Sequence, residues 1–464
     1  MAARVVDAAF AVVYLRLLGR ADVGAYQFLV IFTTYLDTLI DFGLNALVAR
    51  EVSRGSVGAH AAFRAVNLLR LGLWCAGLPI VAIVYGPLRD TTNLSPEAAL
   101  AGWAFYAALL PTVVAKTATG LLWAAERLEL TAGVSVAATV FRTAVGGAAL
   151  FGGLGLIGLA GTSALTNVMT ALALWRLAAR TPAGVGARES RPGVWLRESW
   201  PLFLNQLLQG LFFKVDGVLL LPLAGAVAGG TYAAAYKVSE GAGIVSSAFT
   251  LALFPRLARS GDASSTNPGE VLANAYRLPL RLLLQIAFPL AAGIALLSEP
   301  IVGVVAGRDY LPDSAMALSI LICYLPFSYA NGLTQYVLIA AGRQRLLTGA
   351  FVAALVFNVA ANVVLIPRFG YFGAAWVTVS SELVLLVPFA WAARKVAPGV
   401  SLVREARVPV QATLLMAPVV WWLRDAINPA AAIAAGAIVY PLALWSLGGV
   451  EAHQVRLIRE LFRR

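Results

Sequence analysis

Charged side chains interrupt long apolar runs at several points of this sequence. Lys214 and Asp216 lie inside one apolar run, and Lys237 and Glu240 lie inside the next. Lys116 interrupts a third run, so three of the four lysines of the chain stand in apolar surroundings. If these runs cross a membrane, each charge costs about 2.5–3.5 kcal/mol at bilayer depth, and a chain that keeps it there uses it for function.

The spacing of some of these charges indicates what they could do. Asp37 and Asp41 are four residues apart, so on a helix they share one face, with Asn45 one turn further. Two carboxylates in a low dielectric repel each other, which suits a site for a proton or a cation. Pairing of these carboxylates with a nearby arginine is the alternative. Lys237 and Glu240 are three residues apart and can form a structural ion pair.

The composition indicates a helical membrane protein. Of the 464 residues, 60% are hydrophobic and only 12% are charged, and the mean hydropathy is +0.80. An average soluble chain carries about 25% charged residues. Apolar runs of about 20 residues recur along the chain, as expected of membrane-spanning helices, whereas a membrane β-barrel would show shorter alternating segments.

Other classes of function find little support in the residue pattern. The net charge of +12 could suggest nucleic acid, but the basic residues lie between the apolar runs, where they set membrane orientation. Cys75 and Cys323 are far apart in apolar segments, and His60 and His453 are isolated. We therefore expect no nucleic-acid partner, no disulfide, no metal site, no cofactor and no catalytic residue.

Fourteen spans follow from the apolar runs. The first is shorter than the about 20 residues that a bilayer requires, and Asp7 interrupts it. Either this span tilts or its charged residues snorkel, or, as we expect, the first residue given lies inside a longer first helix. The predicted spans are residues 3–19, 26–49, 66–87, 97–123, 130–151, 155–178, 199–222, 227–254, 276–305, 312–340, 346–366, 372–393, 408–424 and 430–448.

Arginine and lysine predict the orientation of these spans. They gather in the loops that follow every second span, whereas the loops after the fifth and seventh spans hold none. Cytoplasmic loops carry the excess of basic residues. We therefore expect a multi-pass protein of the cytoplasmic membrane with both termini in the cytoplasm.

The two halves of the sequence resemble each other. Residues 17–26 match residues 223–232 at a constant offset of 206, which pairs Gly24 with Gly230 and Arg50 with Arg256. Two further matches join residues 124–133 to 340–349 and residues 155–161 to 370–376. Because each repeat holds six spans, both copies enter the membrane with the same polarity, which predicts two parallel lobes related by a pseudo-twofold axis.

The expected architecture is all-α, with about 14 transmembrane helices in two six-helix lobes and two further helices. The predicted parts are an N-terminal lobe (1–178), a cytoplasmic linker (179–198), a C-terminal lobe (199–393), two additional helices (394–448) and a basic amphipathic tail (449–464).

Four blocks of the sequence resemble the oligosaccharide flippases of polysaccharide biosynthesis, which belong to the multidrug/oligosaccharidyl-lipid/polysaccharide (MOP) exporter superfamily. In the second block a basic residue, an Asp, a Gly-rich turn and an A-Y-K segment follow one another, as is typical of that family. The blocks are residues 15–28 with 41–54, residues 213–241, residues 252–259, and residues 338–345 with 362–378.

The resemblance implies a transporter that moves a polyprenyl-pyrophosphate-linked oligosaccharide to the outer leaflet. It implies a MATE-like arrangement of two lobes, alternating access between them, and coupling to H⁺ or Na⁺. Its partners would be the lipid-linked oligosaccharide, membrane lipids and proteins of polysaccharide assembly.

The same resemblance gives roles to the charges in the spans. Arginine binds phosphate oxygens bidentately, and lysine acts as a point charge. Arg50 and Arg256 would lie at the cytoplasmic mouth, where anchoring is the alternative role. The expected substrate-binding residues are Arg16, Arg20, Lys116, Arg142 and Lys214, and the expected ion-coupling residues are Asp37, Asp41 and Asp216.

Three alternatives stay open at this point. A drug or cation antiporter and a peptidoglycan-precursor flippase belong to the same superfamily. A membrane polysaccharide polymerase or ligase is the alternative from another class. Such an enzyme generally needs a sizeable outer loop with catalytic charges, and every predicted outer loop here is short.

Overall fold

The computed structural model describes residues 2–180, 192–260 and 268–449, and over these ranges the regular structure is helical. The helices are α1 (Ala2–Leu17), α2 (Arg20–Asp41), α3 (Leu44–Ser53), α4 (Ala59–Tyr85), α5 (Pro96–Ala107), α6 (Leu110–Ala124), α7 (Leu128–Phe151), α8 (Gly155–Ala179), α9 (Pro192–Ala224), α10 (Ala226–Ser260), α11 (Pro268–Leu296), α12 (Ser298–Val305), α13 (Asp313–Leu321), α14 (Leu325–Ala340), α15 (Gln344–Val396), α16 (Leu402–Ala426) and α17 (Pro429–Ser446).

Among the described residues, 11 helical stretches are long and apolar enough to cross a membrane. The stretch Gln344–Val396 counts once there, although Gly370 interrupts it with φ 55° and ψ −135°. A left-handed φ favours glycine, and Gly370 lies between the eleventh and twelfth predicted spans. The prediction of an all-α, multi-pass membrane protein is confirmed.

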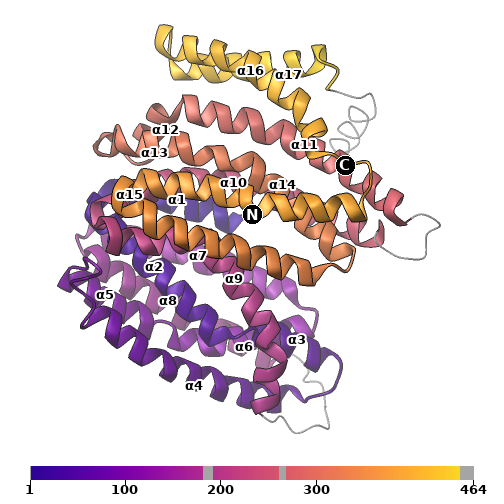
Figure 1. Cartoon of the computed structure of the whole chain (residues 1–464). Coiled ribbons are helices and arrows are strands. Elements are labelled where there is room, and N and C mark those ends of the chain that lie inside the picture. Colours follow the sequence, from indigo (N-terminus) through magenta and orange to yellow (C-terminus); the bar gives the residue numbers. More distant parts are fainter. Residues whose placement is uncertain (1, 181–191, 261–267, 450–464) are drawn as a thin grey trace. The chain divides into compact units, whose positions relative to one another are not determined.

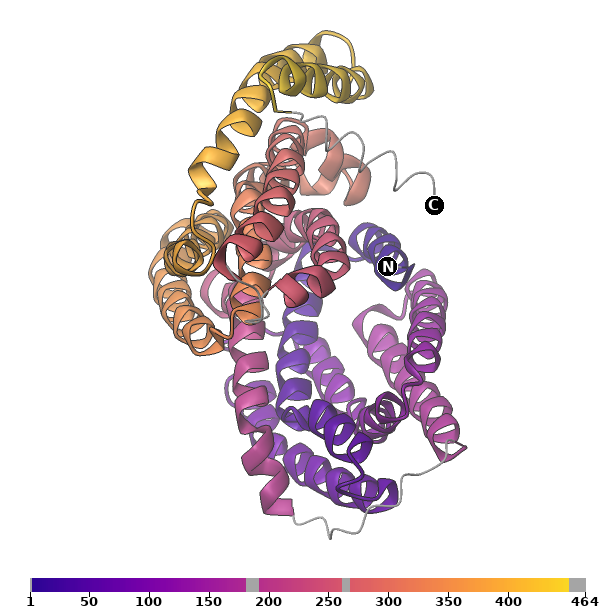
Figure 2. The same cartoon turned by 90° about the vertical axis from the view of Figure 1, so that its right-hand side faces the viewer.

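The chain divides into two compact units, and the first comprises residues 1–233 and 362–371. Within it α2 packs against α4, α5 and α9, and α6 packs against α3, α4 and α8. Figure 2 shows the indigo α2 and the magenta α9 running alongside each other. Helix α2 therefore contacts α4, which carries Arg70, and α9, which carries Lys214 and Asp216.

A break in the backbone sets where α2 ends. Phe42 and Gly43 both have positive φ, 48° and 71°, so α3 leaves in a new direction. A side chain at Gly43 would stand 2.9 Å from the backbone nitrogen of Phe203 on α9. The Phe42 ring stacks on that of Phe203 with centroids 4.3 Å apart. The break thus packs against α9 and fixes Asp41, the last residue of α2.

The closest backbone approach in the first unit lies between α2 and α10. A Cβ at Gly24 would overlap the carbonyl oxygen of Ala226, and a Cβ at Gly230 would overlap that of Arg20. The two contacts are reciprocal under the offset of 206, because Arg20 corresponds to Ala226 and Gly24 to Gly230. Reciprocal contacts of this kind are what a two-fold relation between two segments requires.

The second unit comprises residues 234–361 and 372–464. Figure 1 shows α16 and α17 side by side with α11 next to α16, and these helices share a core that includes Leu297, Met416 and Tyr440. The Arg281 guanidinium on α11 lies 2.7 Å from the Glu405 carboxylate on α16. An apolar core and one buried ion pair therefore hold α16 to α11.

Several predicted features lie outside the described residues. These are most of the linker 179–198, nearly all of the tail 449–464, and the side chain of Arg256. The boundaries of the two predicted lobes stay a prediction.

The approach of α2 to α10 gives a first test. Gly24→Ala should lower the free energy of unfolding by about 1–3 kcal/mol, because the methyl group meets backbone atoms that cannot move aside. Thermal unfolding in detergent measures the change. Gly133→Ala on α7 is the matched control, since no heavy atom lies within 4 Å of the added methyl. An unchanged melting temperature for Gly24→Ala would show that the helices need no glycine there.

Candidate functional site

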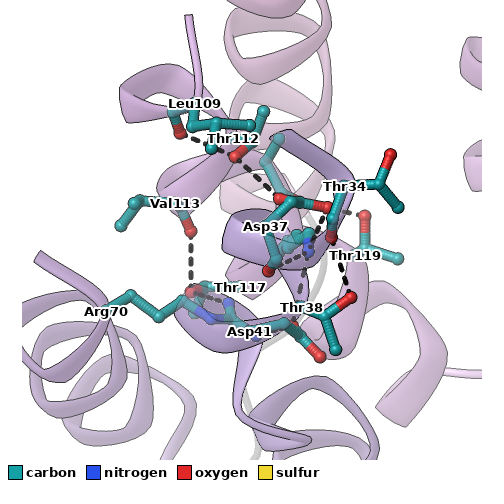
Figure 3. Close-up of polar contacts among 12 residues, drawn as sticks. Thr34, Asp37, Thr38, Asp41, Arg70, Leu109, Thr112, Val113, Thr117 and Thr119 are labelled. Carbon is teal, nitrogen blue, oxygen red and sulfur yellow. Dashed lines mark hydrogen bonds and ion pairs between the residues drawn. The ribbon is translucent and has the colours of Figure 1, made fainter. Parts of the chain in front are cut away.

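Five side chains from three helices form one polar cluster in the first unit. Asp37 and Asp41 come from α2, Arg70 from α4, and Lys116 and Thr117 from α6. Figure 3 shows Asp41 beside Arg70 and Thr117, with Asp37 one turn of α2 away. We call these residues the α2–α4–α6 cluster. Its two carboxylates and two cations balance in charge.

The inner half of the cluster is a buried ion pair. Arg70 Nη2 lies 2.7 Å from Asp41 Oδ1, and the Arg70 side chain is 0% exposed. Arg70 Nη1 donates to Thr117 Oγ1 at 2.6 Å. Taking two charges out of water is costly, and attraction repays this only with good geometry and further hydrogen bonds, which Thr117 supplies. This half is built to hold α2, α4 and α6 together.

The outer half of the cluster is open. Lys116 Nζ lies 2.8 Å from Asp37 Oδ2, and these side chains are 24% and 29% exposed. Lys116 also donates to the Asp37 carbonyl oxygen at 3.2 Å and lies 4.0 Å from Asp41 Oδ1. An anion can therefore compete for Lys116, and a proton or cation can compete at Asp37, without unpacking the inner pair.

The sequence leaves two possibilities for Asp37 and Asp41, a site for a proton or cation and pairing with an arginine. The structure pairs Asp41 with Arg70 and Asp37 with Lys116. Arg70 was missed. It is a single charge in the third predicted span, between apolar neighbours, so the criterion that selected the lysines would also have selected it.

A second ion pair joins α1 to α7. Arg142 Nη2 lies 2.6 Å from Asp7 Oδ1, with side chains 42% and 46% exposed. Asp7, which interrupts the apolar run but not the helix α1, therefore has an electrostatic partner. Nearby on the sequence, Arg16 is exposed in the last turn of α1 and Arg20 is half-buried at the start of α2. None of these three predicted substrate-binding residues belongs to the α2–α4–α6 cluster.

Asp216 on α9 is 3% exposed. Its carboxylate accepts a hydrogen bond from the Tyr232 hydroxyl on α10 and one from the Gly217 backbone N–H at 2.9 Å. Lys214 is half-buried on the same helix. The two hydrogen bonds hold the Asp216 carboxylate between α9 and α10.

Lys237 and Glu240 on α10 lie in the second unit. Lys237 Nζ is 2.8 Å from Glu240 Oε2, one turn along the helix. The structural role predicted for Lys237 and Glu240 and the functional roles predicted for the other charged residues stay predictions. Within the described ranges no three His, Cys, Asp or Glu side chains are grouped so that they could hold a metal ion.

The fold is similar to that of several transporters of known structure. A lipid II flippase MurJ in an inward closed conformation matches with a TM-score of 0.75 at 14% identity, over 95% of this chain and 96% of that one. An inward-facing multidrug resistance MATE transporter of the MOP superfamily matches with a TM-score of 0.69 at 16% identity, over 85% and 94%. A MOP transporter from Pyrococcus furiosus matches with a TM-score of 0.59 at 17% identity, over 85% and 93%. At these identities the matches show a MurJ/MATE-like fold.

Family profiles then identify the chain itself. The profile described as polysaccharide biosynthesis protein matches residues 1–260, and that of lipid II flippase MurJ matches residues 201–436. The chain belongs to the polysaccharide biosynthesis protein and MurJ families of the MOP superfamily, and it is a membrane transporter rather than an enzyme. No curated protein matches the sequence significantly.

The buried pair of the cluster gives a second test. Arg70→Met should lower the free energy of unfolding by about 3–5 kcal/mol, because it leaves the Asp41 carboxylate buried without its cation. The double variant Arg70→Met with Asp41→Leu should recover much of that loss. Arg64→Met, an exposed arginine on the same helix, should change stability by less than about 0.5 kcal/mol. Additive effects in the double-mutant cycle, measured by denaturation in detergent, would contradict the pairing.

Proposed function

We propose that this protein flips a polyprenyl-pyrophosphate-linked oligosaccharide across the cytoplasmic membrane for assembly of a cell-surface polysaccharide. It works by alternating access, coupled to H⁺ or Na⁺, with both termini in the cytoplasm. Membership of the polysaccharide biosynthesis family supports the substrate class. The structural feature on which the proposal depends is the partly exposed Lys116–Asp37 pair on membrane helices.

The open pair suits an exchange between substrate and coupling ion. A pyrophosphate oxygen that takes Lys116 away from Asp37 leaves the Asp37 carboxylate without its cation. That carboxylate then favours a proton or Na⁺, because an uncompensated charge in a membrane helix is costly. Binding of the anion and uptake of the cation thus favour each other. The sealed Arg70–Asp41 pair keeps the helices in place during the exchange.

The other predicted cations extend the anionic site. Arg142 is held by Asp7 at 2.6 Å and is 42% exposed, so a phosphate can reach the same guanidinium bidentately. Arg16, Arg20 and Lys214 are assigned to the same substrate, and Asp216 is assigned to ion coupling beside Asp37. Asp41, also predicted for ion coupling, is assigned instead to the sealed pair with Arg70. Membrane lipids and proteins of polysaccharide assembly are the expected partners.

A second candidate is a flippase for a peptidoglycan precursor. The MurJ family profile over residues 201–436 favours it, as does the MurJ-like fold. Both substrates join a sugar to a polyprenyl carrier through pyrophosphate, so the cations would serve either one. A drug or cation antiporter has the fold alone in its favour, and the charge-balanced cluster offers a free cation no net attraction.

Flipping by the purified protein in vesicles tests the role of Lys116. A fluorescent polyprenyl-pyrophosphate oligosaccharide reports flipping through its access to an impermeant quencher. Lys116→Ala should slow flipping by at least about 10-fold, because the pyrophosphate loses a point charge worth more than 1 kcal/mol. Lys116→Arg should retain part of the rate. The flipping rates of Arg142→Ala and Lys214→Ala should also fall, while both variants remain folded in the membrane.

Lys395→Ala is the control for that assay. The Lys395 ammonium lies 3.5 Å from the centroid of the Trp391 ring near the end of α15, so its loss should leave flipping unchanged. A normal rate for Lys116→Ala would remove Lys116 from the substrate site. A labelled peptidoglycan precursor in the same vesicles separates the two candidates, and faster flipping of that precursor would favour the second.

Ion coupling gives a further prediction. Asp37→Asn and Asp216→Asn remove a titratable charge, and each should abolish the dependence of the flipping rate on pH or on sodium. Asp90→Asn is the control, since the Asp90 side chain is 87% exposed. Flipping is measured across pH steps and sodium gradients. If either variant keeps the full dependence of the natural protein, that residue has no coupling role.

A further inference from the structure

Among the described residues four carboxyl groups are buried, and they differ in their partners. Asp41 pairs with Arg70, and Glu405 pairs with Arg281. Asp216 accepts hydrogen bonds from a tyrosine and from the backbone. The fourth, Glu382 on α15 in the second unit, is 3% exposed and receives its hydrogen bonds from neutral side chains.

Asn331 of α14 is the main neighbour of this carboxyl. Its Nδ2 donates to Glu382 Oε2 at 2.7 Å and to the Glu382 carbonyl oxygen at 2.9 Å. The amide therefore uses both of its hydrogens on one residue. Asn331 is itself 3% exposed, and its Oδ1 is buried without a hydrogen-bond partner. Ser328 on the same helix also hydrogen-bonds the carboxyl.

The double donation fixes which way the amide points. A flipped Asn331 would set its Oδ1 against two oxygens of Glu382, which repel it. The amide thus presents N–H hydrogens, rather than its oxygen, to the carboxyl. A metal cation between the two groups would meet those hydrogens, so the arrangement disfavours Na⁺ and leaves a proton as the ligand that neutralises Glu382.

Other titratable side chains near this site are already engaged. The hydroxyls of Tyr329 on α14 and of Tyr324, the residue just before α14, donate to the backbone oxygens of Ala242 and Ser239 on α10. Within the part of α15 that belongs to the second unit, the charged residue nearest to Glu382 in sequence is Arg394, 12 residues on, which is about 18 Å along a helix. Further titratable groups on the neighbouring helices are Tyr336 on α14, Tyr236 and the Lys237–Glu240 pair on α10, and Glu270, Tyr276, Arg277 and Arg281 on α11. Of these, Tyr276 bonds Thr334, and Arg277 and Arg281 lie beside the Glu405 carboxylate.

An isolated carboxylate is very unfavourable in an apolar interior unless a cation compensates it, and the usual outcome is that the group takes up a proton. Two neutral donors on one side do not supply that compensation. We propose that Glu382 is a proton-binding site of the transport cycle, and that Asn331 is the positioning residue that orients its carboxyl. This rests on the proposed ion-coupled transport, to which it adds the coupling ion and a site. The step is the reversible uptake of one proton from water by one carboxylate oxygen.

Infrared spectroscopy tests the site without any transport assay. The purified natural protein should show the carbonyl stretch of a buried protonated carboxyl group, and the band should vanish as pH rises. Glu382→Gln should lack this band at every pH while keeping the hydrogen bond from Asn331, because the two side chains have the same shape. Asn331→Ala should keep the band but shift its frequency, since the carboxyl loses its donor. Glu299→Gln, an exposed glutamate of the same unit, should change nothing.

Proton flux completes the test. In vesicles with an internal pH dye, the natural protein should move protons when it flips its labelled substrate. In Glu382→Gln the proton flux should be at least about 10-fold lower. This variant should still let the labelled substrate distribute between the two leaflets when no pH gradient is applied. A band that persists in Glu382→Gln, or an unchanged flux, would overturn the proposal. If the band behaves as expected and no lipid-linked oligosaccharide is flipped, the proton site stands and the proposed function falls.

Discussion

The contact of backbone on backbone between α2 and α10 is the constraint on which the first unit depends. Lipid is as apolar as leucine, so helices in a membrane gain little from burying apolar surface and need close packing instead. Gly24 and Gly230 allow that packing because neither has a Cβ to meet the opposite carbonyl. The first turns of α2 are held by this contact, and its C-terminal end is held by the stacking of Phe42 on α9. Both contacts together fix the rotation of α2 about its axis, which directs Asp37 and Asp41 toward α4 and α6.

Burial separates charges that hold the structure from charges that can exchange partners. The Arg70–Asp41 pair is sealed, and it has a third partner in Thr117, so no ligand can enter without breaking the fold. The Lys116–Asp37 pair has the same distance between its charges but faces outward on one side. Equal geometry with unequal exposure is what a transporter needs when one end of a polar cluster must stay fixed while the other responds to ligands.

Much of the fold could be predicted because hydrophobic runs and turn residues along the sequence determine the helices and their ends. Apolar runs gave the spans, and the repeat offset paired Gly24 with Gly230 before their contact was known. The partners across helices could not be predicted in the same way. Whether Asp216 meets Tyr232, or Glu382 meets Asn331, depends on how each helix is rotated, and no period in the sequence of one helix fixes that rotation. Arg70 is a different case, because its isolation in an apolar span was visible.

Charge balance then assigns different tasks to Asp37 and Glu382, two of the carboxyls proposed for ion coupling. Asp37 has a cation of its own, so it takes a proton or Na⁺ only after an anion has drawn Lys116 away, and its occupancy follows the substrate. Glu382 has no paired cation among the residues that the structure describes, so its proton does not depend on an anion and follows the exposure of the site to water instead. A carboxyl of the first kind senses cargo, and one of the second kind senses conformation. A transporter that uses both carboxyls changes between its two conformations only when it has bound a substrate or a proton. This condition couples the two movements, because the empty protein then carries no charge across the membrane.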